Sequence, residues 1–243
     1  MKHVMTIMRA NPPTLGHSLL FEQLNKYTQQ GYAAILFLTH TQIKPVDYRR
    51  VYKLTQNLND PSEIAQISAE ELRNPLSWEQ KKHFVNQIIE AHGFDVEICE
   101  NPDIITLNDK LLFNLVEEGT REVVILVGSD RVPDVEHFAA EFNRTQPTPD
   151  TQIHIEVKSA GDRDADSQSV EGVSATKMRY FAALDDFESF QKGIDGDKDF
   201  AWDIFQAVKF AMEIPEEAKQ AKKKSVQENA LSDYLIKDLY DQL

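Results

Sequence analysis

The sequence predicts an α/β fold, in which a five-stranded parallel sheet is covered by helices on both faces and followed by a helical C-terminal extension. Two observations lead to this prediction. As far as residue 157, short apolar runs alternate with longer segments of helical periodicity. These runs are apolar at consecutive positions, which is typical of parallel strands buried on both sides. Beyond residue 174 the pattern is almost entirely helical.

The elements follow one another in the order of a Rossmann-like domain. A first strand is expected at residues 3–8, and the helix after it begins near Thr14 and ends at Gly31. Ser77, with Gln80 three residues later, forms a capping-box start for another helix, and Pro133 suits a first helical turn. The further strands are expected at 33–39, 96–99, 122–127 and 153–157, and the further helices at 77–93, 106–118 and 133–144.

Two regions stand apart from this alternation. Residues 43–72 are interpreted as an insertion with two short helices, inside a domain that spans residues 1–190. A helix capped by Ser174 follows the last strand, and residues 191–243 form the helical extension. Its segments, together with the end of the domain, are expected at 181–192, 199–212, 215–224 and 226–243.

Composition narrows the function classes. The net charge of −14 over 243 residues makes DNA or RNA an unfavourable partner, because nucleic acids need compensating Lys and Arg. A single cysteine, Cys99, excludes an internal disulfide and fits a reducing compartment. The sequence shows neither a membrane span nor a signal-peptide pattern. We therefore expect a cytoplasmic protein that binds small molecules, and a homo-oligomer stays open.

Three short motifs fall where an open parallel sheet places ligands. They are residues 14–17 after the first strand, 128–130 after the strand at 122–127, and 173–179 after the last strand. Each begins or precedes a helix, whose free N–H groups favour phosphate. Gly16 would let an anion approach the backbone, His17 could donate to a phosphoryl oxygen, and Arg179 offers a fork for phosphate oxygens.

Each motif also has a structural interpretation. His17 could be an ordinary helix-start histidine, residues 128–130 a turn with an Asp cap, and Ser174 with Thr176 a helix cap. His40 could simply end a strand. The acidic run at 162–166 lacks the spacing of a calcium loop, so no protein-held metal site is predicted.

Taken together, these motifs resemble the nucleotidylyltransferase superfamily with its (His/Thr)-x-Gly-His signature. The matching residues are Asn11-Pro-Pro-Thr-x-Gly-His17, Gly128-Ser-Asp130 and Ser174-x-Thr-x-x-Arg179. The chain looks most like the cytidylyltransferase-like and adenylyltransferase proteins encoded by large tailed bacteriophages, over residues 1–190. That likeness extends to Thr39-His-Thr-Gln42, Arg73-Asn-Pro-Leu76 and Lys81, whereas Met8 stands where the family usually has glycine.

The resemblance implies an enzyme that transfers a nucleoside monophosphate, AMP in preference to CMP, from a Mg²⁺-bound triphosphate to a small phosphorylated acceptor, with release of pyrophosphate. It implies catalytic roles for Thr14, His17 and Arg179. Acceptor specificity is expected from the insertion and residues 73–81. The implied nucleotide contacts are Arg9, Asn11, Gly16, Gly128, Asp130, Ser174 and Thr176, and the implied substrate contacts are His40, Arg73 and Lys81.

Two other functions stay open at this point. Met8, the insertion and the helical extension would also suit a protein that keeps the fold without the chemistry and serves a structural or assembly role, for example in a phage particle. A relative of the class I aminoacyl-tRNA synthetases would share the Gly-His turn. Triphosphate binding distinguishes the enzyme from the first alternative, and tRNA binding would reveal the second.

Overall fold

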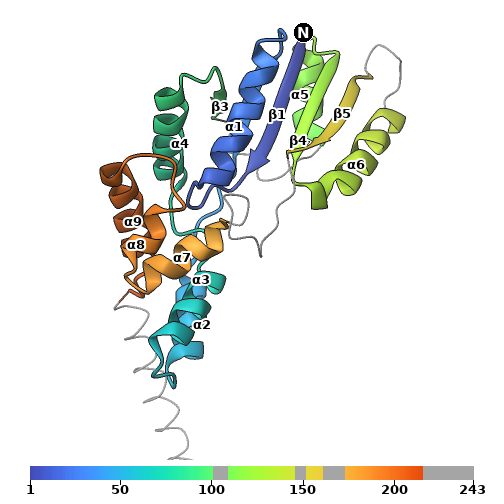
Figure 1. Cartoon of the computed structure of the whole chain (residues 1–243). Coiled ribbons are helices and arrows are strands. Elements are labelled where there is room, and N and C mark those ends of the chain that lie inside the picture. The colour runs from blue at the N-terminus through green and yellow to red at the C-terminus, as the bar shows by residue number, and fades with distance from the viewer. Residues whose placement is uncertain (101–108, 146–151, 161–172, 216–243) are drawn as a thin grey trace, which may run out of the picture.

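A single parallel sheet forms the centre of the protein. The computed structural model describes residues 1–100, 109–145, 152–160 and 173–215. Its strands pair in the order β3-β2-β1-β4-β5, all parallel (Figure 1), which confirms the predicted fold class. The direction of winding reverses between β1 and β4, so the carboxyl ends of these two strands flank the usual ligand crevice. The strands are β1 Lys2–Met8, β2 Ala33–Leu38, β3 Glu97–Cys99, β4 Glu122–Val127 and β5 His154–Ser159.

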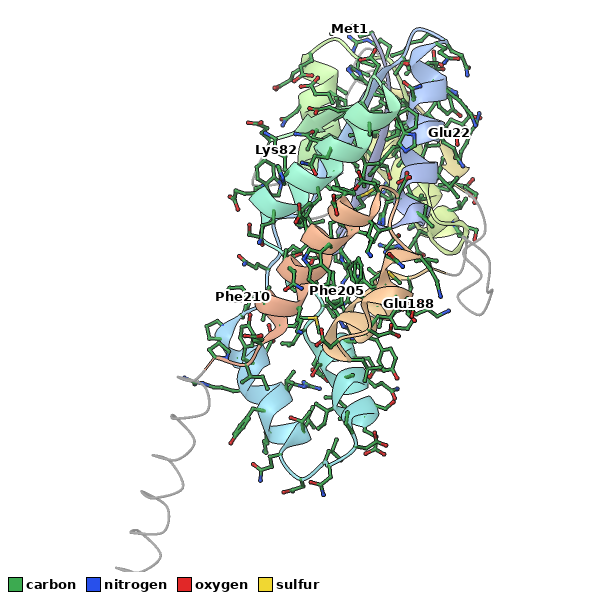
Figure 2. All side chains as sticks on the ribbon, turned by 60° about the vertical axis from the view of Figure 1, so that its left-hand side comes forward. Met1, Glu22, Lys82, Glu188, Phe205 and Phe210 are labelled. Atoms are coloured by element: carbon green, nitrogen blue, oxygen red, sulfur yellow. The ribbon has the colours of Figure 1, made fainter. Side chains whose placement is uncertain are left out.

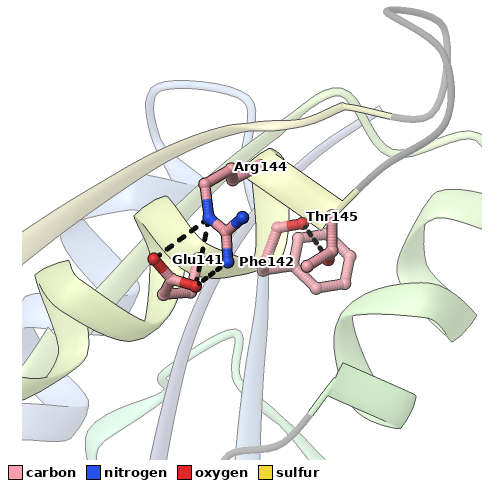
Figure 3. A network of polar contacts seen from close by, with 4 residues as sticks. All are labelled: Glu141, Phe142, Arg144 and Thr145. Carbon is pink, nitrogen blue, oxygen red and sulfur yellow. Dashed lines mark hydrogen bonds and ion pairs between the residues drawn. The ribbon is translucent and has the colours of Figure 1, made fainter.

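Helices cover both faces of the sheet because successive strand residues point to opposite sides. Val124 and Leu126 of β4 pack beneath α1 (Leu15–Thr28) and α4 (Trp78–His92). Val123 and Ile125 pack on the other face, beneath α5 (Asp109–Glu117) and α6 (Val132–Thr145). In the last turn of α6, Arg144 and Glu141 form an exposed ion pair, and the Thr145 hydroxyl donates to the Phe142 carbonyl (Figure 3).

Helix α4 begins and ends where the sequence predicts, with Ser77 before its first residue and Gly93 after its last. Ser77 accepts from the backbone of Gln80 at 3.2 Å, and Gln80 Oε1 accepts from the backbone of Ser77 at 2.9 Å. Gly93 ends the helix with a φ of +65°, in the left-handed region that glycine tolerates best. Local signals in the sequence therefore mark both ends of this helix.

The predicted insertion and the C-terminal helices pack together as a helical lobe beyond the carboxyl edge of the sheet (Figure 1). Its helices are α2 (Pro45–Thr55), α3 (Pro61–Glu71), α7 (Ala175–Ala183), α8 (Phe187–Gln191) and α9 (Lys198–Met212). They share one apolar core with Phe84 of α4, and Figure 2 shows Phe205 inside it and Phe210 on the outside. The insertion is thus packed against α7, α8 and α9.

One helix boundary was predicted wrongly. The expected helix at 181–192 is interrupted, because Asp185 has a φ of +62° and Asp186 starts α8 by accepting from the Ser189 N–H at 3.0 Å. Residues 216–243 lie outside the described residues, and they include nearly all of the helices expected at 215–224 and 226–243. Residues 106–108, the start of the helix expected at 106–118, also lie outside them. No helix within the described ranges is both long enough and apolar enough to cross a membrane.

Candidate functional site

The turn after β1 holds His17 in a defined orientation. The Thr14 N–H donates to His17 Nδ1 at 3.1 Å, and Thr14 Oγ1 lies 2.9 Å from the same nitrogen. Since Nδ1 accepts, the neutral ring carries its proton on Nε2. His17 is therefore fixed at the start of α1 as a donor through Nε2.

The first turn of α1 is partly occupied by protein. The Leu15 N–H donates to the Gly193 carbonyl at 3.0 Å, and the His17 N–H donates to the Thr14 carbonyl at 2.8 Å. The Gly16 N–H has no acceptor among the described residues. A side chain built at Gly16 would approach only Thr14 Oγ1, at 3.8 Å, so the space beside this glycine is open. The helix start thus retains one backbone donor for an anion.

Asn11 ties the turn to the segment before α4. Its side chain is 1% exposed and donates to the Leu76 carbonyl at 3.1 Å, while the Leu76 N–H donates back to Oδ1 at 2.9 Å. The Asn11 carbonyl accepts from Arg179 Nη1 at 2.8 Å. Asn11 therefore connects the turn after β1 with Leu76, between the insertion and α4, and with Arg179 of α7.

Arg179 is buried, with 5% of its surface exposed. Besides Asn11, it binds the Ala69 carbonyl through Nε at 2.9 Å and Thr176 Oγ1 through Nη2 at 3.0 Å. Burial first, and then the positive charges of Arg9 and Arg73, lower its pKa to about 10. Arg179 therefore contacts the turn just before residues 14–17, and Leu15 contacts Gly193, but no described hydrogen bond joins the segments 14–17 and 174–179 directly. Ser174 caps α7, as predicted, by accepting from the Lys177 N–H at 3.2 Å.

Lys81 is completely buried near the same edge of the sheet. Its ammonium group donates to the Thr39 carbonyl at the end of β2. Burial and, to a smaller extent, the charge of Arg9 lower the pKa of Lys81 to about 8, against the opposing effect of Glu79. Lys81 and Arg179 therefore both sense the charge of Arg9.

We call Arg9, Arg73, Lys81 and Arg179 the cation cluster. Within the described ranges, none of the four forms an ion pair with a carboxylate. This is unusual in a chain with a net charge of −14, which has acidic side chains in excess. The cluster leaves positive charge unneutralised at the carboxyl edge of the sheet.

The other predicted site residues lie around this cluster or away from it. His40 stacks on Trp78, with ring centres 4.6 Å apart, and its pKa is lowered by burial first and by Lys81 second. His40 Nε2 is buried without a hydrogen-bond partner among the described residues. Gly128 starts the short helix η1 (Ser129–Arg131) after β4, and no described hydrogen bond joins it to the cluster. The side chain of Asp130 lies outside the described part of the structure.

Met8 does not stand among these polar groups. It is 7% exposed and packs in the apolar core beneath α1 and α4. The family's glycine position is therefore occupied here by a core side chain.

A polar pocket of about 350 Å³ lies where the insertion leaves and rejoins the sheet domain. Arg73 lines it, as do Arg50 of α2 and Glu71 of α3. The sequence analysis placed acceptor specificity in the insertion but did not single out Arg50 or Glu71. Both residues lie among other charged residues on predicted helices, so no local sequence signal distinguished them from ordinary surface residues.

Comparison with other proteins adds no assignment: no protein-family model matches the chain, and no curated protein matches it either. In the described ranges, no three His, Cys, Asp or Glu side chains are grouped so that they could hold a metal ion. The chemistry of the site must therefore be argued from the cation cluster, the α1 start and the pocket.

Proposed function

We propose that the protein is a nucleotidylyltransferase, which transfers a nucleoside monophosphate from a triphosphate to a small phosphorylated acceptor. The observation that carries the proposal is the unpaired cation cluster beside the start of α1, at the carboxyl ends of the strands. Four positive side chains without carboxylate partners favour a ligand with several negative charges. A triphosphate supplies them.

In the proposed reaction, an acceptor oxygen attacks the α-phosphorus of the triphosphate. A new oxygen–phosphorus bond forms, the bond to the bridging oxygen breaks, and pyrophosphate leaves with the bonding electrons. His17 Nε2–H and the Gly16 N–H would donate to phosphoryl oxygens as negative charge builds up there. Arg9 and Lys81 would stabilise the same charge electrostatically, and no covalent enzyme intermediate is needed.

Mg²⁺ suits this arrangement if the triphosphate carries it. Mg²⁺ commonly keeps waters and phosphate oxygens as ligands, so the triphosphate itself would carry the ion. When bound, the ion would neutralise phosphate charge. We expect ATP to be preferred to CTP as the donor.

The test combines binding with turnover. Calorimetric titration with ATP and with CTP, each with Mg²⁺, measures triphosphate binding, and a coupled assay measures pyrophosphate release across a panel of phosphorylated acceptors. His17→Ala should lower turnover by about 10²–10³-fold. His137→Ala, an exposed histidine on α6, serves as the matched control and should keep full turnover. Equal turnover of wild type and His17→Ala would refute the role of His17, and the absence of triphosphate binding would refute the enzyme.

One observation favours the alternative, a structural or assembly protein that retains the fold. Arg179, which the resemblance assigns to phosphate binding, donates to the carbonyls of Asn11 and Ala69, and the Leu15 N–H at the start of α1 donates to the carbonyl of Gly193. In this alternative the same contacts serve to join the sheet domain to the helical lobe. A stable oligomer or a location in phage particles, without triphosphate binding, would support it.

A further inference from the structure

The pocket at the base of the insertion is built almost entirely from polar side chains. Ile43 is its only apolar lining residue, and no aromatic residue lines it. The remaining lining residues are two arginines, two carboxylates and two amides: Arg50, Arg73, Asp47, Glu71, Gln42 and Asn74. A lining of this kind cannot stack a base or bury an apolar body, but it can bind hydroxyl and charged groups in several directions.

The charged groups of the pocket are arranged so that one arginine retains donors. Arg50 Nε pairs with Glu71 Oε2 at 2.7 Å, so part of each charge is already engaged. Arg73 uses Nε on the Glu70 carbonyl at 2.9 Å, whereas its Nη groups form no hydrogen bond to the described residues. The two Nη groups of Arg73 can therefore bind an anionic group in the bidentate manner typical of arginine and phosphate.

The pocket adjoins the cation cluster through consecutive residues of the chain. Arg179 binds the carbonyl of Ala69, and Arg73 binds the carbonyl of the next residue, Glu70, so both guanidinium groups lie against the end of α3. The Ile43 N–H donates to the Asn74 carbonyl at 3.0 Å, which joins the two chain segments that line the pocket. A ligand in this pocket would therefore lie beside an anion bound at the cluster.

We propose that this pocket binds the acceptor of the transfer reaction, and that the acceptor is a small polyol phosphate such as a sugar phosphate. The phosphate is bound by Arg73, and the hydroxyl groups bind the Arg50–Glu71 pair, Asp47 and the amides of Gln42 and Asn74. A volume of about 350 Å³ accommodates a molecule of this size. The proposal rests on the proposed function, because it names the substrate that receives the nucleotide.

The experiment measures binding by calorimetry, with the full chain and without triphosphate, so that no turnover intervenes. The probes are ribose 5-phosphate, ribose, phenyl phosphate and inorganic phosphate, each at millimolar concentration. Arg73→Gln should weaken ribose 5-phosphate binding by about tenfold to a hundredfold, because a hydrogen-bonded charge is lost. Arg50→Gln should weaken it by about threefold to tenfold. Arg49→Gln changes the same residue type one position earlier on α2, outside the pocket, and should bind like the wild type.

The outcomes separate this inference from the proposed function, because ATP–Mg²⁺ is titrated into the same variants. Ribose 5-phosphate should bind more tightly than ribose, phenyl phosphate or inorganic phosphate, and Arg50→Gln should leave ATP–Mg²⁺ binding unchanged. If ATP–Mg²⁺ binds but ribose 5-phosphate does not, or binds Arg50→Gln and the wild type equally, the inference fails and the proposed function stands. If phenyl phosphate or inorganic phosphate binds as tightly as ribose 5-phosphate, the hydroxyl groups are not recognised and the ligand is not a polyol phosphate.

If only ribose 5-phosphate binds and ATP–Mg²⁺ does not, the acceptor role fails along with the proposed function. Thermal melting confirms that each variant is folded.

Discussion

Lys81 connects the proposed triphosphate site to a proton count that can be measured. Its pKa of about 8 means that about half of the side chains are neutral at pH 8. A triphosphate near the cation cluster favours the charged ammonium form, so binding should take up protons from solution. Protons are taken up rather than released, because a nearby anion raises the lowered pKa of Lys81 back toward its ordinary value.

The size of the uptake can be estimated from Coulomb's law. One negative charge at about 8 Å, with an effective dielectric constant of about 20, contributes about 2 kcal/mol, or about 1.5 pKa units. A shift of this size takes Lys81 from about half to nearly full protonation at pH 8, an uptake of about 0.4–0.5 proton per triphosphate. At pH 7 Lys81 is already about nine-tenths charged, so its uptake falls to about 0.1 proton.

The assay is calorimetric titration with ATP–Mg²⁺ at pH 8 in buffers of different ionisation enthalpy, since the observed heat then reports the protons exchanged. Lys81→Met, which keeps the length of the side chain without its charge, should abolish the uptake. Lys82→Met, at the neighbouring and more exposed position on α4, should retain it. An uptake that is the same in wild type and Lys81→Met, or a net release at pH 8, would show that Lys81 does not sense the ligand.

Three further predictions concern the contacts that join the two parts of the protein, and urea denaturation measures each. Arg179→Met removes two buried hydrogen bonds and one partly buried one and should lower the free energy of unfolding by about 3–5 kcal/mol, and a loss below 1 kcal/mol would contradict this role. Asn11→Ala leaves the N–H and carbonyl of Leu76 unpaired and should cost about 2–4 kcal/mol, whereas an unchanged midpoint would show that water replaces the side chain. Gly193→Ala would place a methyl group 2.5 Å from Met178 Sδ and should cost about 1–3 kcal/mol, unless the methionine moves aside without loss.

The sheet domain could be predicted because its signals are local. Apolar runs such as residues 122–127 mark buried strands by themselves, and Ser77, Gln80 and Gly93 mark the two ends of α4 through hydrogen bonds within a few residues. The break between α7 and α8 escaped prediction for the opposite reason. Asp185 adopts a left-handed conformation that non-glycine residues seldom take, and no neighbouring residue in the sequence announces it.

The partnership of the insertion with the C-terminal helices could not be predicted in the same way. Leu72 and Leu76 share a core with Phe190 and Phe205, more than a hundred residues further along the chain. Helical periodicity shows that each segment has an apolar face, but not which other face covers it. The same limit applies to Arg179: its residue type suits phosphate, and only the tertiary structure reveals that it binds the carbonyls of Ala69 and Asn11.

The electrostatics of the site favour anion binding whichever reaction follows. Arg179 and Lys81 donate to backbone carbonyls and form no direct ion pair among the described residues, although acidic side chains outnumber basic ones by 40 to 26 in this chain and Glu79 acts on Lys81 from a distance. Carbonyl dipoles compensate a buried charge less well than an ion does, and the lowered pKa values of both residues express that cost. Under the proposed function, an anionic ligand would relieve the mutual repulsion among Arg9, Lys81 and Arg179.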